Sequence, residues 1–243
     1  MGNCDKPPCK TEGYCCDAKK QQIEECCPDK RGCPDTQLSG SDLKSDANVA
    51  KYHQERSKLS TRKAKGKFSK SECYYKRKCV LHPKKDTEKK SKPNMCCPSQ
   101  TGHHIVPDSA MKSSGYCYDY DNALTVCVAG SGNRVGNHGL MHLRLCKKLR
   151  GGGKIKFSDL LENGMNAVKE TLVDSGCDWK CLKKEIDKNH KEMSSTPEGK
   201  KKKGCEQLED DSDIDKNCGM AYSGGKLTKI AESISDIMAY VNV

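Results

Sequence analysis

Apolar residues are sparse in the first hundred positions and more regular after residue 96, where they predict two strands and a helix. The run 104–107 (HIVP) ends at a proline and predicts the end of a strand. The β-branched run 123–128 (ALTVCV) predicts a second strand. Leucines at helical spacing in 137–149 (NHGLMHLRLCKKL) predict a helix, which the glycines at 151–153 should stop. The order strand, strand, helix is therefore expected in the middle of the chain.

Further helices are expected after this central part. Residues 158–173 predict one helix, with Ser158 as its N-cap, and residues 178–192 predict a second. A last amphipathic helix is expected over 226–241, and residues 194–217 before it have the composition of a polar linker.

The N-terminal hundred residues lack such regularity. Residues 1–60 predict loops and short helices, one of them polar over 44–60. We therefore expect an α+β chain, largely helical and irregular, in three regions. These are a cysteine-rich basic region (1–95), a central core with the helices that follow it (96–193), and the linker with its amphipathic helix (194–243).

The chain has too few apolar residues for an apolar core alone to stabilise its fold. Leu, Ile, Val and Phe together make 35 of the 243 residues, a fraction typical of disordered chains. Eleven of the 18 cysteines lie in the first hundred residues, with doublets at Cys15–Cys16, Cys26–Cys27 and Cys96–Cys97. Adjacent cysteines rarely ligate one metal, so disulfides to different partners are favoured over mixed metal sites. Cys177 and Cys181 fit a disulfide better than half of a zinc site.

The net charge of +11 is concentrated in one segment. Residues 61–92 hold thirteen Lys or Arg against three acids, and aromatic residues are interleaved with them. Such a segment suits a phosphate backbone, although a solvated basic loop would have the same composition. The candidate nucleic-acid contacts are Lys76, Arg77, Lys78, Arg134 and Arg144.

The chain shows no targeting segment. The start, MGNCDKPPCK, has no apolar stretch of the kind a signal peptide carries, and no apolar run approaches the length of a membrane span. Stable disulfides imply maturation outside a reducing cytosol. An excised domain, or cargo of a secretion machine that needs no signal peptide, is therefore expected, without a membrane partner.

Four of the seven histidines lie between positions 103 and 142. His138 and His142 are four residues apart on a predicted helix, so both can bind one cation. His103 and His104 are adjacent on an extended segment, so their side chains point to opposite faces and only one of them can readily join the metal. In a competing interpretation, His138 and His142 form a closed zinc site with two cysteines. The cysteines of that site would be Cys127 and Cys146. Independently of either interpretation, the remaining histidines, His53, His82 and His190, are expected to be solvated.

These motifs together resemble a known family. TGHHIVP, DNALTVC and HGLMH resemble the ββα-metal motif of the HNH and endonuclease VII superfamily, over roughly residues 96–146. More closely, they resemble the GHH-signature toxin nucleases that bacteria deliver through type VI and related secretion systems. The resemblance implies a small ββα-metal centre, a phosphodiesterase activity on DNA more than on RNA, and an immunity protein as partner.

The resemblance also implies a role for each motif residue. His103, His138 and His142 would bind one divalent ion (Mg²⁺, Mn²⁺ or Zn²⁺), and His104 would be the general base. Asn122 would hold the loop that keeps His104 aimed, although it could also be merely a turn residue before the strand. The competing hypothesis is a non-enzymatic nucleic-acid-binding module stapled by zinc and disulfides, in which the histidines are structural.

Overall fold

The computed structural model describes residues 15–28, 33, 51, 54, 58–63, 67–88, 94–98, 100–130, 136–172, 175–195 and 204–218. The helix expected over 226–241 lies outside this set, as do Ala47, Val49 and Tyr52 of the helix expected over 44–60. His53 and Arg134 lie outside it as well. The described residues form an α+β fold, as the sequence predicts.

An antiparallel three-stranded sheet lies at the centre, in the order β1-β3-β2. Its strands are β1 (Leu81–Pro83), β2 (Gln100–His104) and β3 (Leu124–Ala129). The strand predicted over 123–128 is thus confirmed with a shift of one residue. The other strand ends at His104, three residues before the predicted end. Residues 105 and 106 already bend toward helix α4 (Asp108–Ser113), for which Pro107 is the N-cap.

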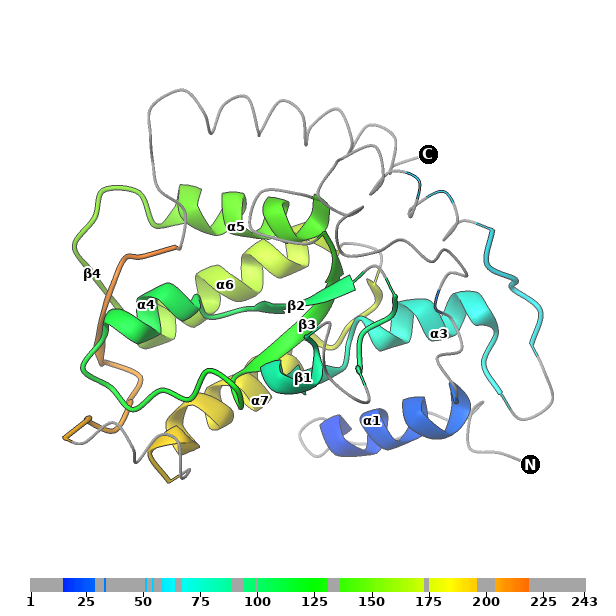
Figure 1. The fold of residues 1–243 in the computed structure, drawn as a ribbon, viewed down its shortest axis with the longest axis horizontal. Helices are drawn as coiled ribbons and strands as arrows, with labels where there is room; N and C mark the ends of the chain where they lie inside the picture. Colours follow the sequence, from blue (N-terminus) through cyan, green and yellow to red (C-terminus); the bar gives the residue numbers. More distant parts are fainter. Residues whose placement is uncertain are drawn as a thin grey trace.

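Three long helices cover this sheet, and all three were predicted. They are α5 (Gly136–Lys148), α6 (Phe157–Thr171) and α7 (Trp179–Lys191), and a 3-10 turn, η5 (Glu192–Ser195), follows α7. In Figure 1, α5 runs along one side of β2 and β3 and α7 along the other. The three glycines after α5 all have positive φ, which stops the helix as expected.

The start of α6 differs from the prediction that Ser158 is its N-cap. The helix begins at Phe157, and its N-cap is Lys156, which makes no side-chain capping bond. The amides of Phe157 and Ser158 instead donate to the carbonyls of Ser212 and Asp210, at 2.9 and 3.0 Å. The helix start is therefore satisfied by a distant part of the chain, so it needs no local cap.

A single large group of buried side chains joins the sheet to these helices. We call this group the main core, and its members are Leu81, Ile105, Val106, Ala110, Met111, Val126, Val128, Met141, Leu145, Cys146, Leu149, Phe157, Leu160, Leu161, Met165, Ala167, Val168, Leu172, Cys177, Leu182, Ile186, Leu208, Ile214 and Cys218. Gly164 allows α6 to pack closely here, because a Cβ at this position would lie 2.2 Å from the carbonyl oxygen of Ile105.

The expectation of a polar linker over 194–217 is wrong for residues 204–217, which are part of the fold. Strand β5 (Asp213–Asp215) pairs antiparallel with β4 (Lys154–Lys156), and Leu208 and Ile214 are buried in the main core. Leu208 and Ile214 are isolated apolar residues, and acidic residues surround them in the sequence. No hydrophobic period was therefore present to reveal the strand.

The N-terminal elements form a second, smaller group at one end of the molecule (Figure 1). Helix α1 (Cys15–Cys26) and helix α3 (Lys70–Arg77) contribute to it. The buried residues, which we call the N-terminal cluster, are Ile23, Cys26, Cys27, Phe68, Cys73 and Val80. A short 3-10 turn, η3 (Lys84–Asp86), follows β1. In the described part of the chain, no helix is both long enough and apolar enough to cross a membrane.

Disulfides connect these parts, as the cysteine doublets predicted. Between described residues, the bridges include Cys27–Cys73, Cys33–Cys97, Cys79–Cys177, Cys96–Cys127, Cys117–Cys205 and Cys146–Cys218. The adjacent Cys96 and Cys97 bind different partners, and Cys181 is also disulfide-bonded. The competing zinc site with Cys127 and Cys146 is wrong, because both sulfur atoms are consumed in disulfides.

Candidate metal centre

Three of the four clustered histidines converge on one point. His103 comes from β2, while His138 and His142 come from successive turns of α5, and one ligand atom from each lies within 4.8 Å of the others. The rings of His138 and His142 are stacked at 5.2 Å between centroids, and that of His103 stands edge-on to both, at 4.9 and 4.7 Å. The four-residue spacing on the helix brings His138 and His142 together, as the sequence predicted. His103 joins them from β2, as the resemblance implied.

Hydrogen bonds orient the two helical histidines. The Thr101 hydroxyl donates to the carbonyl of Gly130 at 2.7 Å, so its oxygen accepts from Nδ1–H of His138 at 3.0 Å. His142 donates its Nδ1–H to the carbonyl of Cys218, at 3.3 Å. In both rings Nε2 is then left with its lone pair, the form that binds a metal.

The third ring has an unsatisfied nitrogen. Nδ1 of His103 is buried and has no hydrogen-bond partner, and the whole residue is only 2% exposed. A buried polar atom without a partner is costly, and a cation at the centre of the three rings would supply that partner. The donor set of three imidazole nitrogens therefore fits a divalent metal ion.

Burial keeps these histidines neutral at physiological pH. The pKa values of His103 and His138 lie well below the usual 6.5, because burial disfavours the charged form and neighbouring histidines add repulsion. Burial lowers the pKa of His142 to about 4, although the bond to Cys218 acts in the opposite direction. Since only a neutral imidazole binds metal, the three rings are ready for a cation at pH 7.

His104 lies outside the triad. The adjacency of the two histidines predicted that only one of them could join the other two, and the resemblance implied that this one is His103. Its ring packs against Tyr120 at 5.1 Å between centroids, and its Nε2 is buried without a partner. A hydrogen bond to the backbone carbonyl of Tyr120 raises its pKa. Burial, together with the charge of Lys84, outweighs that bond and lowers the pKa to about 3. Because Nε2 has no partner, the bond to Tyr120 is made by Nδ1. The neutral ring then presents the lone pair of Nε2.

Asn122 holds the turn that contains Tyr120. Its amide N–H and its side-chain Nδ2 both donate to the carboxylate of Asp119, at 3.1 and 2.6 Å, and Lys85 donates to its Oδ1 at 2.7 Å. Asn189 on α7 donates to its backbone carbonyl at 3.2 Å. These contacts fix the loop whose Tyr120 carbonyl accepts the hydrogen bond from His104.

The expected nucleic-acid contacts make bonds within the protein. Residues 70–77 of the basic segment form helix α3 rather than a loop. Lys76 lies over the Phe68 ring at 4.6 Å, Lys78 is buried over Tyr74 at 4.7 Å, and Arg77 donates to the carbonyl of Cys27.

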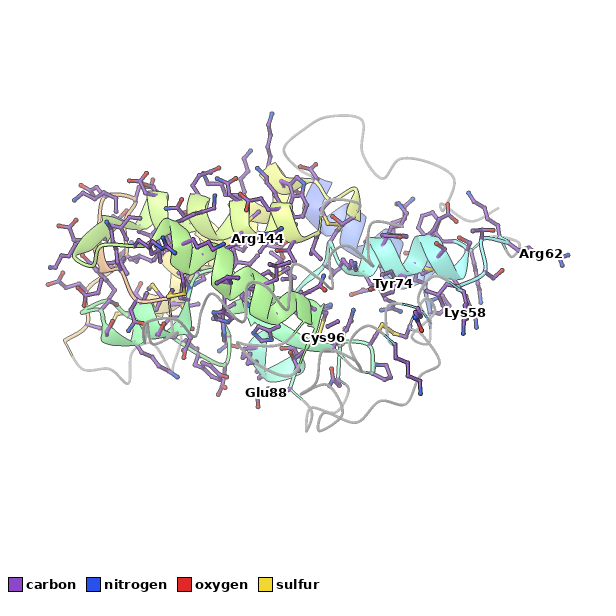
Figure 2. The ribbon with its side chains drawn as sticks, turned by 90° about the horizontal axis from the view of Figure 1, so that it is seen from above. Lys58, Arg62, Tyr74, Glu88, Cys96 and Arg144 are labelled. Carbon is purple, nitrogen blue, oxygen red and sulfur yellow. A yellow bond between two sulfur atoms is a disulfide. The ribbon has the colours of Figure 1, made fainter. Side chains whose placement is uncertain are left out.

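Arg144, the other described candidate, lies well away from this helix. It donates to Thr171 at 2.8 Å and lies 3.8 Å from the carboxylate of Glu170. Figure 2 shows it apart from Tyr74, which marks α3. The four described candidates for nucleic-acid contacts all lie outside the histidine triad; they are Lys76, Arg77, Lys78 and Arg144.

Two expectations about single histidines are wrong, and one lysine was missed. His82 and His190 were expected to be solvated, but both are buried, His82 in β1 and His190 against Phe157 and Tyr118. Lys84 follows β1 and donates from Nζ to the carbonyl of Gly102, next to His103. The only feature of the sequence that pointed to the position of Lys84 was Pro83, the last residue of the short strand before it.

Comparison with known proteins relates the chain to a bacterial toxin. No family model and no solved structure matches the chain. DNase toxin Tse7 of Pseudomonas aeruginosa is 27% identical over 192 residues, covering 68% of this chain and 48% of the relative. The chain is a distant homologue of a DNase toxin. It spans about half the length of that relative, and this similarity agrees with a toxin nuclease as the class of protein.

Proposed function

We propose that this chain is a metal-dependent endonuclease of the HNH type that acts on DNA as an antibacterial toxin. The observation that carries the proposal is the triad of His103, His138 and His142, whose ligand atoms lie within 4.8 Å of one another. A fourth neutral histidine, His104, stands beside it on the same strand. The similarity to a DNase toxin supports DNA as the substrate.

The triad residues would hold the cation, and His104 would move the proton. When bound, a divalent ion would supply charge stabilisation for the phosphate and for the leaving 3′ oxygen. Nε2 of His104 is the free base position, so it would accept the proton of the water that attacks phosphorus. The hydrogen bond from Nδ1–H to Tyr120 keeps this tautomer, and Asn122 keeps the carbonyl of Tyr120 in place.

The pKa of His104, about 3 without substrate, matters for this role. A general base works best when its pKa is near the working pH, so the free protein holds a weak base. Burial and the positive charge of Lys84 are the main causes of the low value. A bound phosphodiester carries a negative charge, which would offset Lys84 and raise the pKa of His104 in the complex.

The number of ligands distinguishes this proposal from a structural zinc site. A structural zinc is closed by four protein ligands, whereas a catalytic metal keeps one position open. Cys127 and Cys146, the expected extra ligands, are held in disulfides with Cys96 and Cys218. Within the described ranges the group contains three histidines, which would leave a position for water or phosphate.

The biological setting forms part of the proposal. We infer delivery into a target cell and an immunity protein in the producing cell, by analogy with the GHH-signature toxins. The disulfides agree with a chain that matures outside a reducing cytosol. The three regions 1–95, 96–193 and 194–243 stay a proposal for its organisation.

Plasmid cleavage by the purified chain tests the activity. Reactions contain Mg²⁺, Mn²⁺, Zn²⁺ or EDTA, and the variants are His104→Ala and His142→Ala. His190→Leu is the matched control, because His190 is also buried but lies outside the triad. We expect metal-dependent cleavage that falls by at least about 100-fold in the first two variants and persists in the control.

Metal content separates the two roles. His142→Ala should lose bound metal, whereas His104→Ala should retain it and lose only turnover. Intact plasmid under every condition, from folded protein that still retards DNA in a gel, would reject the nuclease and favour the binding-module hypothesis. A parallel reaction on RNA tests the remaining choice of substrate.

A further inference from the structure

Lys84 lies beside the strand that carries His103 and His104. Its Nζ donates to the carbonyl of Gly102 at 3.2 Å, one residue before His103. Nζ also lies 6.0 Å from the centre of the Tyr120 ring, which packs on His104. The charge of Lys84 lowers the pKa of His103, His104 and His138, which agrees with a position beside both parts of the site.

The backbone of Lys84 is held firmly in this place. Its amide donates to the carbonyl of Ala123 at 3.0 Å, in the loop before β3. Its carbonyl accepts from both the amide and the hydroxyl of Thr87, at 3.0 and 2.9 Å. A side chain on a backbone fixed at both ends is suited to recognise a ligand with little loss of entropy on binding.

The charge of Lys84 has no carboxylate partner at ion-pair distance in the part of the chain that the structure describes. Asp108 and Glu88 attract it through space, and each is bonded to another side chain through one of its carboxylate oxygens. Asp108 is paired with Lys112 at 2.9 Å, and Glu88 accepts from the hydroxyl of Tyr120 at 3.3 Å. A half-buried cation without a counter-ion is costly, and an anion in this place would compensate it.

We propose that Lys84 binds a backbone phosphate of the nucleic acid beside the metal centre and so orients the scissile phosphodiester toward His104. This inference rests on the proposed function. The basic composition of residues 61–92 did not indicate that Lys84, among its lysines, would contact a phosphate. A lysine ammonium is a compact donor that binds phosphate as a point charge, and each such contact releases counter-ions.

Lys84 is better suited to this contact than the lysines of α3. Lys76 and Lys78 lie over aromatic rings of the N-terminal cluster and its helix, which engages their charges inside the protein. Lys84 instead directs its charge to the strand that carries His103 and His104. Among the described residues of the basic segment, Lys84 thus lies beside the site, whereas Lys76 and Lys78 pack on aromatic rings away from it.

Binding and cleavage of a short fluorescent DNA duplex test the role of Lys84. Lys84→Gln removes the charge but keeps a donor for the carbonyl of Gly102, and Lys84→Arg keeps the charge. Lys180→Gln, on the exposed surface of α7, is the charge-matched control. Affinity is measured in EDTA over a range of salt concentrations, and kcat and KM are measured with metal.

We expect the logarithmic salt slope of Lys84→Gln to fall by about one, and its kcat/KM to fall by about 10- to 100-fold, with unchanged metal content. Lys84→Arg should restore most of both, and the control should match the wild type. A slope and kcat/KM in Lys84→Gln equal to those of the control would overturn the inference, even if the wild type cuts DNA. Lys84→Met removes the same charge should the glutamine variant not fold.

The failure of the proposed function is recognised separately. A wild-type chain that binds the duplex without cutting it would reject the nuclease, and the salt slope of Lys84→Gln would still decide the phosphate contact. A wild-type chain that does not bind the duplex at all would reject both.

Discussion

The main core and the N-terminal cluster are stabilised in different ways. The main core has 24 buried residues, most of them aliphatic or aromatic side chains from the sheet and from α4 to α7, and three of them are cysteines. The N-terminal cluster has six residues, and three of these are also cysteines. A region with so few apolar side chains cannot bury enough surface to order itself, so its covalent bridges must restrict the unfolded chain. The candidate metal site is built on the first kind of region, where strand and helix positions are fixed by packing.

The largest expected effect comes from removing the bridge inside the N-terminal cluster. The Cys27–Cys73 disulfide closes a loop of 46 residues, and loop entropy alone predicts a loss of about 4 kcal/mol in Cys27→Ala/Cys73→Ala. We expect this variant to expose residues 15–28 and 67–78 to hydrogen exchange while α5 and α6 stay protected. Cleavage by trypsin in the basic segment should increase at the same time.

The matched control removes a bridge of the main core. Cys146→Ala/Cys218→Ala opens a loop of 72 residues, so its entropic effect is similar. Apolar packing should hold the main core together, and unfolding should stay a single transition at lower temperature. If both pairs open the same segments, the two regions are not stabilised differently and the comparison fails.

The next largest effect concerns the close approach of α6 to Ile105 at Gly164. A Cβ at Gly164 would lie 2.2 Å from the backbone oxygen of Ile105, which cannot move without shifting the end of β2. We expect Gly164→Ala to lower the free energy of unfolding by about 3 kcal/mol, although alanine improves helix propensity by about 1 kcal/mol. Denaturant unfolding measures the change.

The neighbouring position is the control for helix propensity. Asn163 lies on the same turn of α6 and is not fully buried, so Asn163→Ala should leave stability unchanged or raise it by a few tenths of a kcal/mol. A Gly164→Ala variant as stable as Asn163→Ala would mean that α6 and Ile105 do not approach so closely.

Much of the candidate site was predictable because its information is local. The four-residue spacing of His138 and His142 and the adjacency of His103 and His104 each specify a direction on a regular element. The partners that complete the site are not local. Thr101 and Cys218 orient two of the rings from a neighbouring strand and from a segment far along the chain.

The same distinction explains what the sequence did not predict in the fold. The helices α5 to α7 and strand β3 follow from periodic apolar residues. Strand β5 carries a single apolar residue, Ile214, between acids, and it forms because β4 pairs with it. His190 was expected to be solvated because it has no partner by spacing, yet the helix that carries it packs against Phe157. Burial of a single polar residue depends on tertiary packing, which periodicity does not encode.

Buried histidine makes the main core sensitive to acid. Burial lowers the pKa of His190 to about 4, from 6.5 in the unfolded chain. Between these two values the unfolded state binds more protons than the folded state, so stability is full above pH 6.5 and is lost as the pH falls toward 4. Between pH 7 and 4.5, the free energy of unfolding should therefore fall by about 2 kcal/mol less in His190→Leu than in the wild type. Urea unfolding in EDTA measures this difference. An identical pH dependence in wild type and variant would show that His190 is not buried as a neutral ring.

The smallest expected effect compares two serines at helix starts, one in each region. Ser69 caps α3 with a full capping box, in which its side chain accepts from the amide of Glu72 at 3.1 Å and Glu72 accepts from its amide at 2.8 Å. Ser69→Ala should therefore cost about 1 kcal/mol, detected as faster hydrogen exchange in the N-terminal cluster. Ser158 has the better sequence for a cap, but α6 starts on the carbonyls of Ser212 and Asp210, so Ser158→Ala should cost almost nothing. An equal loss of stability in Ser69→Ala and Ser158→Ala would mean that α6 depends on a local cap after all. Loss only in Ser69→Ala would show that local signals matter most where the apolar core is smallest.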